Sequence, residues 1–240
     1  MTDIQTDSEA TLYLISTPIG NAKDWSYRAV DVVKGLSALA CEDTRLTWKL
    51  LTIYGIPRPP IMFANNEFNE NTVADKITHL LKSGTSVGLC SDAGSPCIAD
   101  PGYPAVAKAI EANIPVVFIP GPNAATAALA LSGLPVSSYT FLGFAPRKTI
   151  KRRNFLSKEK DAKHTLIFYE SPRRLAGLLE DALVVFGDRR VAVCIELTKM
   201  FENVRRDWLS VMVEAFRERE VKGEVTVVIA GNNAKFIRKV

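Results

Sequence analysis

The stretch that decides the fold is Ser91-Asp92-Ala93-Gly94-Ser95-Pro96-Cys97-Ile98-Ala99-Asp100-Pro101-Gly102. It follows the apolar segment 87–90 and precedes residues 103–110, whose apolar positions recur at helical spacing. A strand, a Gly- and Pro-rich loop and a helix in this order are how an open α/β sheet presents a small-molecule site. Because a strand-to-helix connection usually needs only a few residues, a loop of twelve residues predicts a ligand-binding loop.

Apolar segments and helical patterns alternate on both sides of this loop. Strands are expected at 12–16, 38–41, 61–64, 87–90 and 116–119. Helices are expected at 27–34, after a cap at Asp43, and around Val73 to Leu81. This alternation predicts a mainly parallel sheet with helices on both faces.

The segment Pro120-Gly121-Pro122-Asn123 interrupts the alternation, and Asn123 is predicted to cap a helix over 124–131. A second series then follows, with strands expected at 140–144, 165–169, 191–195 and 225–230. Its helices are expected after Ser171-Pro172, which should cap the first of them, and over 208–219. We therefore expect two small α/β domains, 1–122 and 123–240, with a cofactor cleft between them, since clefts between domains are favoured ligand sites.

Composition narrows the class of protein. The chain has 240 residues, of which 47% are hydrophobic, and no apolar stretch is long enough to span a membrane. Its first ten residues are polar and acidic, unlike a secretory signal. Its four cysteines form no C-x-x-C pair, which favours reduced, mostly buried thiols and a cytoplasmic location. Because its two histidines lie far apart in the sequence, no metal site is expected.

The formal net charge of +4 is unevenly distributed. The densest basic segment is 147–153, which holds five cations in seven residues. Such a segment suits the phosphates of a polyanion, although a solvated loop and helix start would have the same composition. We expect it to be a loop that does not pack into a core and that is mobile until phosphates bind. The pairs Arg173-Arg174, Arg189-Arg190 and Arg205-Arg206 add charge to the same half of the chain.

Eight short motifs carry a resemblance to one family, and the match spans residues 12–231. They are Thr17-Pro18-Ile19-Gly20-Asn21, Glu42-Asp43-Thr44-Arg45, the 91–102 loop, Pro120-Gly121-Pro122, Gly143-Phe144-Ala145-Pro146-Arg147-Lys148, Phe168-Tyr169-Glu170-Ser171-Pro172, Glu196-Leu197-Thr198-Lys199 and Lys222-Gly223-Glu224. In this order they resemble the ribosomal RNA small subunit methyltransferase I family, within the tetrapyrrole (corrin/porphyrin) methylase superfamily. The sequence departs from the family's pattern at two places. Arg173 stands where the family usually has His, and the sequence stops at Val240, soon after the last expected strand, where family members usually continue into a helical tail.

The resemblance implies S-adenosylmethionine (SAM)-dependent 2′-O-methylation of a cytidine in the decoding region of 16S rRNA, in the small ribosomal subunit. It also implies a homodimer of two-domain subunits. By this resemblance the SAM pocket would be lined by Pro18, Asp92, Ala93, Gly94, Ser95, Ile98, Asn123, Ala124, Tyr169, Glu170 and Thr198. From the residues alone, Asp92 could instead cap a turn, and Gly94 could serve only to allow a positive φ.

A ribose hydroxyl is a poor nucleophile at neutral pH, so a general base or a polarising cation would assist its methylation. Candidates at or just beyond predicted strand ends are Glu42, Asp43, Arg45, Lys199 and Glu224. The structural alternatives are a helix cap for Asp43 and an ion pair between Glu42 and Arg45. For RNA binding the candidates are Arg147, Lys148, Lys151, Arg152 and Arg153.

Two other functions stay open at this point. Tetrapyrrole C-methyltransferases share the superfamily's fold, and their substrates carry carboxylates that a basic surface would also attract. The motifs 42–45 and 196–199 favour the ribosomal branch over a precorrin or uroporphyrinogen methylase. A SAM- or RNA-binding protein without catalysis is the third possibility.

Overall fold

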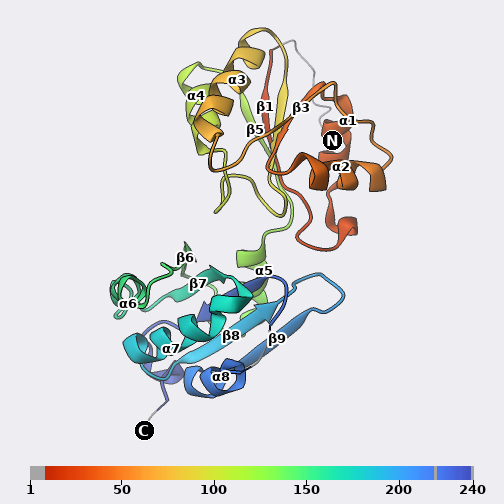
Figure 1. The fold of residues 1–240 in the computed structure, drawn as a ribbon. Coiled ribbons are helices and arrows are strands. Elements are labelled where there is room, and N and C mark those ends of the chain that lie inside the picture. The colour runs from red at the N-terminus through yellow and green to blue at the C-terminus, as the bar shows by residue number, and fades with distance from the viewer. Residues whose placement is uncertain (1–8, 219–220, 239–240) are drawn as a thin grey trace. The chain divides into compact units, whose positions relative to one another are not determined.

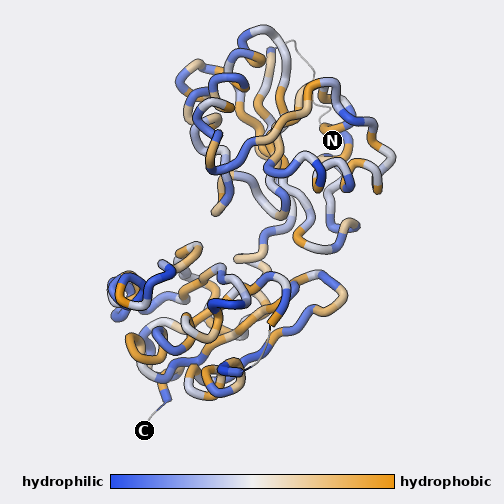
Figure 2. The backbone as a smooth tube through the Cα atoms, viewed as in Figure 1, coloured by the Kyte–Doolittle hydropathy of each residue, from blue (hydrophilic) through white to orange (hydrophobic). Residues whose placement is uncertain are grey.

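The structure is a computed structural model that describes residues 9–218 and 221–238. The chain forms two compact units, one up to Asn123 and one from Ala124 onward. Figure 1 shows them as two separate bodies of helices and strands, which are described in turn. Hydrophobic residues follow the strands of both sheets in Figure 2, as expected of strands buried under helices.

Unit 1 contains a five-stranded parallel sheet in the order β3-β2-β4-β1-β5. The strands are β1 (Leu12–Ile15), β2 (Ala38–Cys41), β3 (Ile61–Ala64), β4 (Val87–Cys90) and β5 (Val116–Ile119). The prediction of a mainly parallel sheet for this half of the chain is confirmed.

Helices cover both faces of this sheet. α1 (Tyr27–Gly35) and α2 (Thr44–Ile53) bury Val33 and Leu51 in one core cluster, together with Leu39 of β2. α3 (Glu70–Lys82) and α4 (Tyr103–Glu111) pack in a second cluster with Ala38 and Ala40 of β2. Successive residues of a strand point to opposite faces, so the alternation within β2 places the two helix pairs on opposite sides of the sheet.

Unit 2 contains a mixed five-stranded sheet in the order β6-β7-β10-β8-β9. β6 (Tyr139–Phe144) and β7 (Thr165–Glu170) are parallel to one another. β10 (Val225–Ile229) lies antiparallel between β7 and β8 (Arg190–Ile195), and β9 (Asn203–Trp208) is the antiparallel edge strand beside β8.

Four longer helices pack on this second sheet. α6 (Thr149–Ser157), α7 (Leu175–Phe186) and α8 (Leu209–Phe216) contribute to one core cluster with alternate residues of β7, β8 and β10. α5 (Ala124–Ser132) also packs against β7, β8, β9 and β10. The 3₁₀ turns are η1 (Ala22–Asp24), η2 (Pro172–Arg174) and η3 (Ala234–Phe236).

The helix expected over 208–219 is present as α8, which begins at Leu209, but β9, which ends at Trp208, is a strand that the sequence pattern did not predict. Two predictions of local structure were wrong. The basic segment is not a loop, because residues from Thr149 onward form α6. Ser171 precedes η2 and its side chain makes no capping hydrogen bond, so the helix beyond it begins only at Leu175.

The cysteines are free thiols, with Cys41, Cys90 and Cys194 buried and Cys97 half-buried. Among residues 9–218 and 221–238 no cluster of histidine, cysteine or carboxylate side chains could hold a metal ion. None of the helices that the structure describes is long and apolar enough to cross a membrane. Residues 1–8, most of the polar N-terminal stretch, lie outside the described residues.

Candidate functional site

The carboxyl edge of the unit 1 sheet has the geometry of a ligand crevice. β1 and β4 are neighbours, but β1 continues into α1 on one face and β4 continues into α4 on the other. Loops that leave adjacent parallel strands toward opposite faces open a crevice at the strand ends, where ligands of such sheets bind. The 91–102 loop follows β4 and therefore lies at this switch point.

Hydrogen bonds join the loops that follow β1 and β4. The Thr17 N–H donates to the Gly94 carbonyl at 2.8 Å, and the Gly94 N–H donates to the Thr17 carbonyl at 3.1 Å. The Thr17 hydroxyl donates to the Ser91 carbonyl at 3.1 Å, and the Ser16 and Ser95 hydroxyls lie 3.0 Å apart. Because Pro18 directly follows Thr17, the structure brings this predicted cofactor residue beside residues 92–95.

The loop after β5 also reaches this edge. A Cβ added to Gly121 would lie 2.9 Å from the Ser16 Cβ, so only glycine allows this close approach. Gly94 has a different reason to be glycine, because its φ is +86° while an added Cβ would meet nothing closer than 3.4 Å. The predicted positive φ at Gly94 is thus confirmed.

Backbone strain is concentrated in two of the predicted site loops. Of the described non-glycine residues, Cys97, Ala99, Asn113, Glu196 and Thr198 have positive φ. Two of them lie in the 91–102 loop and two in the 196–199 motif. Left-handed conformations cost about 1–2 kcal/mol for an ordinary residue and are found preferentially at functional sites. The strain marks these two loops as candidate functional elements.

Asp92 fastens the end of β4 to the end of β2. Its carboxylate accepts the Asp43 N–H at 2.9 Å, and the Glu42 carboxylate accepts the Asp92 N–H at 3.3 Å. Burial raises the pKa of Asp92, and the negative charges of Glu42 and Asp43 raise it further. The contact joins two strand ends that are distant in sequence and is not the turn cap considered for Asp92, and the half-buried carboxylate still reaches solvent at the crevice.

Asp43 caps α2, as predicted. Its carboxylate accepts the Arg45 N–H at 2.8 Å and forms an ion pair with the Arg45 guanidinium at 2.6 Å. These hydrogen bonds hold the pKa of Asp43 well below its usual range, which makes it a weak proton acceptor. The expected Glu42–Arg45 ion pair is wrong, because the guanidinium of Arg45 pairs with Asp43 and Glu42 contacts the backbone of Asp92.

A pocket of about 520 Å³ opens beside the 91–102 loop. It is lined by Glu42, Asn66, Glu67, Phe68, Glu70, Ala99, Asp100 and Pro101. Its four carboxylates favour a cationic or amino group and disfavour a phosphate. Residues 66–70 were missed in the sequence because the loop after β3 carries no recognisable motif.

Tyr169 and Glu170 end β7 in unit 2. The Tyr169 hydroxyl accepts the Ala125 N–H at 3.2 Å, which places it at the start of α5 beside Ala124. The Glu170 side chain is buried, accepts the Ser171 N–H at 2.7 Å and pairs with Arg174 at 3.0 Å. Its carboxylate is therefore engaged within unit 2. The predicted helix cap at Asn123 stays a prediction.

Lys199 lies between two carboxylates. Its Nζ is 2.8 Å from Glu196 Oε1 and 3.0 Å from Glu224 Oε2. The Glu224 N–H also donates to Glu196 Oε1 at 2.9 Å, and a Cβ added to Gly223 would lie 2.0 Å from the same oxygen. The structure thus brings together the predicted candidates Lys199 and Glu224, and Glu196 is a member that sequence reasoning missed.

The charge state of Lys199 follows from these contacts. Burial lowers its pKa, but the hydrogen bonds to Glu196 and Glu224 outweigh burial and raise the pKa above its ordinary value. Lys199 is therefore protonated at neutral pH. It can polarise or stabilise a developing negative charge, but it cannot accept a proton as a general base.

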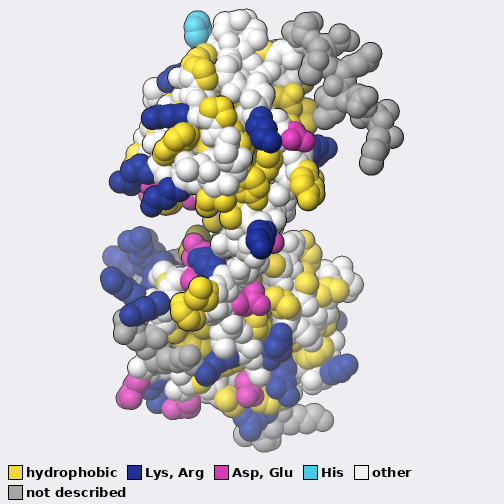
Figure 3. All heavy atoms as spheres, turned by 90° about the vertical axis from the view of Figure 1, so that its right-hand side faces the viewer, with side chains coloured by type: hydrophobic (Ala, Val, Ile, Leu, Met, Phe, Trp, Pro, Cys, Tyr) yellow, Lys and Arg dark blue, Asp and Glu magenta, His cyan; other side chains and the backbone are white. Residues whose placement is uncertain are grey.

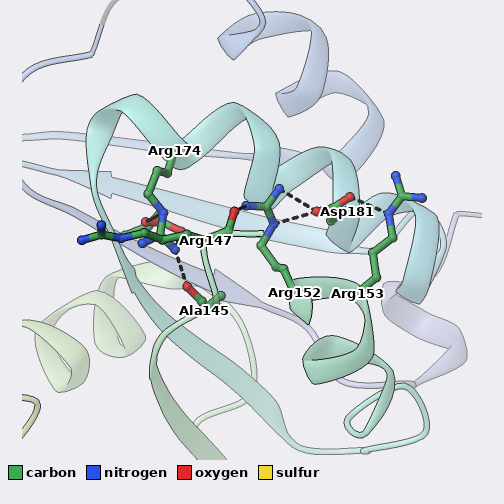
Figure 4. A network of polar contacts seen from close by, with 7 residues as sticks. Ala145, Arg147, Arg152, Arg153, Arg174 and Asp181 are labelled. Carbon is green, nitrogen blue, oxygen red and sulfur yellow. Dashed lines mark hydrogen bonds and ion pairs between the residues drawn. The ribbon is translucent and has the colours of Figure 1, made fainter. Parts of the chain in front are cut away.

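In the basic segment, Arg152 and Arg153 both point toward Asp181 (Figure 4). Arg152 is 6% exposed and donates to Asp181 at 2.6 Å, and Arg153 donates to the other Asp181 oxygen at 2.6 Å. The expectation that this segment cannot pack into a core is therefore wrong, because buried Asp181 of α7 neutralises the charge. Of the predicted RNA-binding residues, only Arg152 is buried. Arg147, Lys148, Lys151 and Arg153 are exposed and can meet phosphates, although Arg153 is also paired with Asp181.

In each of the three arginine pairs, one arginine donates a hydrogen bond to a backbone carbonyl and so stabilises the fold. Arg174 donates to the Ala145 carbonyl, Arg189 donates to the Phe186 carbonyl at 3.1 Å, and Arg206 donates to the Leu131 carbonyl at 2.8 Å. On the face of unit 2 seen in Figure 3, basic side chains are interspersed with acidic and apolar ones.

A parallel α/β sheet with a strained loop at its carboxyl edge defines the class of proteins that bind a small molecule at the strand ends. Residues 11–211 match the family described as Tetrapyrrole (Corrin/Porphyrin) Methylases. The chain belongs to this family and is a methyltransferase.

Curated relatives are similar over most of the chain. The Ribosomal RNA small subunit methyltransferase I of Halalkalibacterium halodurans is 44% identical, over 96% of this chain and 79% of that protein. The proteins of the same name from Bacillus subtilis and Thermotoga maritima are each 40% identical over 92% of this chain, covering 75% and 98% of their own lengths.

Solved structures agree in fold. A cobalt precorrin-4 methyltransferase has a TM-score of 0.65 at 15% identity, covering 92% of this chain and 94% of that one. A diphthine synthase has a TM-score of 0.69 at 16% identity, covering 92% and 90%. At these identities the likeness extends to the fold alone, and the predicted α/β fold of the tetrapyrrole methylase type is confirmed.

Proposed function

We propose that this chain transfers a methyl group from SAM to the 2′-hydroxyl of a cytidine in the decoding region of 16S rRNA. The observation that carries the proposal is the 40–44% identity, over more than nine-tenths of the chain, to proteins named Ribosomal RNA small subunit methyltransferase I. The small ribosomal subunit is then the substrate. From the resemblance in motifs, we also propose that the chain acts as a homodimer.

The carboxyl edge of unit 1 fits SAM. The half-buried carboxylate of Asp92 can bind an amino group, and the peptide groups of residues 93–95 lie in a loop that turns at Gly94 with a positive φ. Ile98 is 44% exposed and, with Pro18, offers apolar surface for an adenine. SAM supplies, when bound, an electrophilic methyl group on a sulfonium, so the chain's task is to align the acceptor hydroxyl with it.

We assign to Lys199 the stabilisation of the negative charge that develops on the ribose oxygen as the hydroxyl proton passes to water and the oxygen takes the methyl group. Glu196 and Glu224 hold its ammonium group in place and keep it protonated. A preorganised cation at a developing charge is worth about 10²- to 10³-fold in rate, by comparison with single oxyanion-hole donors.

Replacement of Lys199 tests this role. Lys199→Met should lower kcat for methyl transfer about 10²-fold and leave the Kd for SAM within about twofold. Lys199→Arg keeps the charge and should recover part of the rate. Since the hydrogen bonds to Glu196 and Glu224 raise the pKa of Lys199 above its ordinary value, loss of its proton should not reduce activity near neutral pH. Equal kcat for Lys199→Met and the unmodified chain would remove Lys199 from the mechanism.

The acceptor is tested by offering two substrates. Small ribosomal subunits that lack this methylation and uroporphyrinogen are incubated separately with the enzyme and SAM carrying a radioactive methyl group. We expect label in the RNA of the subunits and none in the tetrapyrrole. Label in the tetrapyrrole alone would make the chain a tetrapyrrole C-methyltransferase. RNA binding without transfer at saturating SAM would support a non-catalytic binding protein.

The exposed cations at the start of α6 are proposed to hold the RNA. Arg147, Lys148 and Lys151 lie within one helical turn of the N-terminus of α6, on the solvent side of a helix that Arg152 and Arg153 fasten to α7. Phosphate contacts from such side chains would position the RNA without reading its sequence.

A further inference from the structure

The connection between β8 and β9 carries two large apolar side chains in water. Met200 is 90% exposed and Phe201 is 78% exposed. They line a pocket of about 410 Å³ together with Ile195, Glu202, Asn203, Val221 and Lys222. Adjacent exposed apolar side chains at a pocket are costly to keep in water and mark a binding surface.

We propose that this pocket binds an unstacked nucleobase of the RNA substrate, with the Phe201 ring stacked on the base and Lys222 at a neighbouring phosphate. The inference rests on the proposed function, because it takes RNA as the substrate. It adds a base-binding site whose residues were not among the candidates identified from the sequence.

The chemistry of the lining favours a nucleobase over a purely apolar ligand. An aromatic face and a cation in one pocket are the combination by which proteins bind single-stranded RNA. Asn203 is exposed and offers an amide that can both donate to and accept from a base edge. A partner helix with an apolar face would leave Lys222 and Asn203 without hydrogen-bonding partners when it buried them.

The wall that carries Phe201 is fixed before any ligand binds. The Thr198 N–H donates to Glu202 Oε2 at 2.6 Å, and the Glu202 N–H donates to the Lys199 carbonyl at 3.1 Å. Glu196 and Thr198 hold positive φ values of +53° and +65° within the same turn. A preformed loop loses little conformational freedom on binding, which increases affinity.

The same turn connects the pocket to the chemistry. Lys199 lies two residues before Phe201, and its ammonium group is held by Glu196 and Glu224. A base on Phe201 would therefore belong to a nucleotide close to the ribose whose oxygen Lys199 stabilises. Stacking here would hold the base of that nucleotide apart from its neighbours, as aromatic side chains do with the unstacked bases of single-stranded RNA.

The test compares variants of Phe201 in methyl transfer to small ribosomal subunits that lack the modification. Stacking on one base contributes about 1–3 kcal/mol, so Phe201→Ala should lower kcat/KM for the subunits about 5- to 150-fold. Phe201→Tyr keeps the ring and should stay within about threefold of the unmodified enzyme. Phe201→Leu keeps apolar volume without a π face, and it should resemble Phe201→Ala.

Controls separate stacking from other roles. Val184→Ala removes an apolar side chain that is 63% exposed on α7 and should leave kcat/KM unchanged. SAM affinity by calorimetry and the thermal midpoint should be the same for all Phe201 variants. Methyl transfer by Phe201→Ala equal to that of the unmodified enzyme would overturn the inference. So would a change in molecular mass by light scattering in Phe201→Ala, which would make the pocket a contact between copies of the chain.

The same experiment distinguishes failure of the proposed function from failure of the base-binding site. If the unmodified enzyme transfers no methyl group to the subunits, RNA methylation is wrong whatever Phe201 does, and this inference falls with it. If the unmodified enzyme is active and Phe201→Ala is equally active, only the base-binding site is wrong.

Discussion

Asp92 combines a structural contact with a position at the crevice, and two substitutions separate these roles. Asp92→Asn keeps an oxygen that can accept the Asp43 N–H but loses the negative charge, whereas Asp92→Ala loses both. If the carboxylate binds the ammonium group of SAM, both variants should bind SAM about 10- to 100-fold more weakly, the range of a charged hydrogen bond. Isothermal calorimetry measures this affinity.

The control for Asp92 is Asp75→Asn, which removes an exposed carboxylate that pairs with Lys108 and should leave SAM binding unchanged. If Asp92→Asn binds SAM as the unmodified chain does and only Asp92→Ala is impaired, Asp92 acts by fastening β4 to β2. Its contribution to the site would then be positional.

Arg152 and Arg153 are neighbours in sequence with different expected effects on stability. Arg152 is buried, so Arg152→Ala leaves the Asp181 carboxylate buried without its main partner and should cost about 3–5 kcal/mol of unfolding free energy. The Arg153 side chain is 46% exposed, so Arg153→Ala should cost about 1 kcal/mol or less. Urea unfolding followed by circular dichroism gives both values, and equal losses would show that the two arginines share Asp181 equally.

At the scale of the helices and strands, the exposed cations at the start of α6 form a proposed RNA-binding surface that substitutions can test. Arg147→Ala, Lys148→Ala and Lys151→Ala together remove three exposed cations and leave the Asp181 network intact. Each phosphate contact contributes about 0.7 to the slope of log affinity against log salt for single strands, so the slope should fall by up to about 2. Electrophoretic mobility shifts at several salt concentrations measure it.

The matched control for α6 is the exposed triple Lys34→Ala, Lys49→Ala and Lys82→Ala in unit 1, which removes the same charge elsewhere. An unchanged salt slope in the α6 variant, or an equal fall in the control, would leave α6 without a specific role. Substitution of Arg152 or Arg153 in this experiment would confuse lost RNA contact with lost stability.

The pattern of apolar residues was sufficient for the elements of unit 1. Segments 38–41, 61–64, 87–90 and 116–119 form strands with the expected bounds, because buried parallel strands read as short apolar runs between turn residues. The edge strand β9 was missed because Val204-Arg205-Arg206-Asp207 is mostly charged, so its half-buried and exposed side chains give no apolar pattern.

Contacts between residues that are far apart in the chain could not be predicted from the sequence pattern. Nothing near Arg152 indicates that Asp181 lies beside it, since the partners are far apart in the chain and meet only when α6 packs on α7. The same holds for the pocket of Phe201, where Val221 and Lys222 join residues of another connection. The candidate loops themselves were predictable, because their Gly, Pro and strand-end positions are local properties.

At the scale of the whole molecule, the fold does not determine the acceptor. Cobalt precorrin-4 methyltransferase and diphthine synthase have similar folds at 15% and 16% identity, and their names indicate different substrates. The distinction must come from particular residues, such as the Glu196–Lys199–Glu224 network and the exposed cations of α6.

The position of the methyl group on the RNA gives the most specific test of the proposed function. Alkali cleaves RNA because the 2′-hydroxyl attacks the adjacent phosphate, so a 2′-O-methyl group blocks cleavage at that nucleotide, whereas a methyl group on a base does not. After methylation of small subunits and complete alkaline hydrolysis of their RNA, we expect the label in one dinucleotide whose 5′ residue is a cytidine. Label recovered in single nucleotides would show that the chain methylates a base, and Lys199 would then have no ribose oxygen to stabilise.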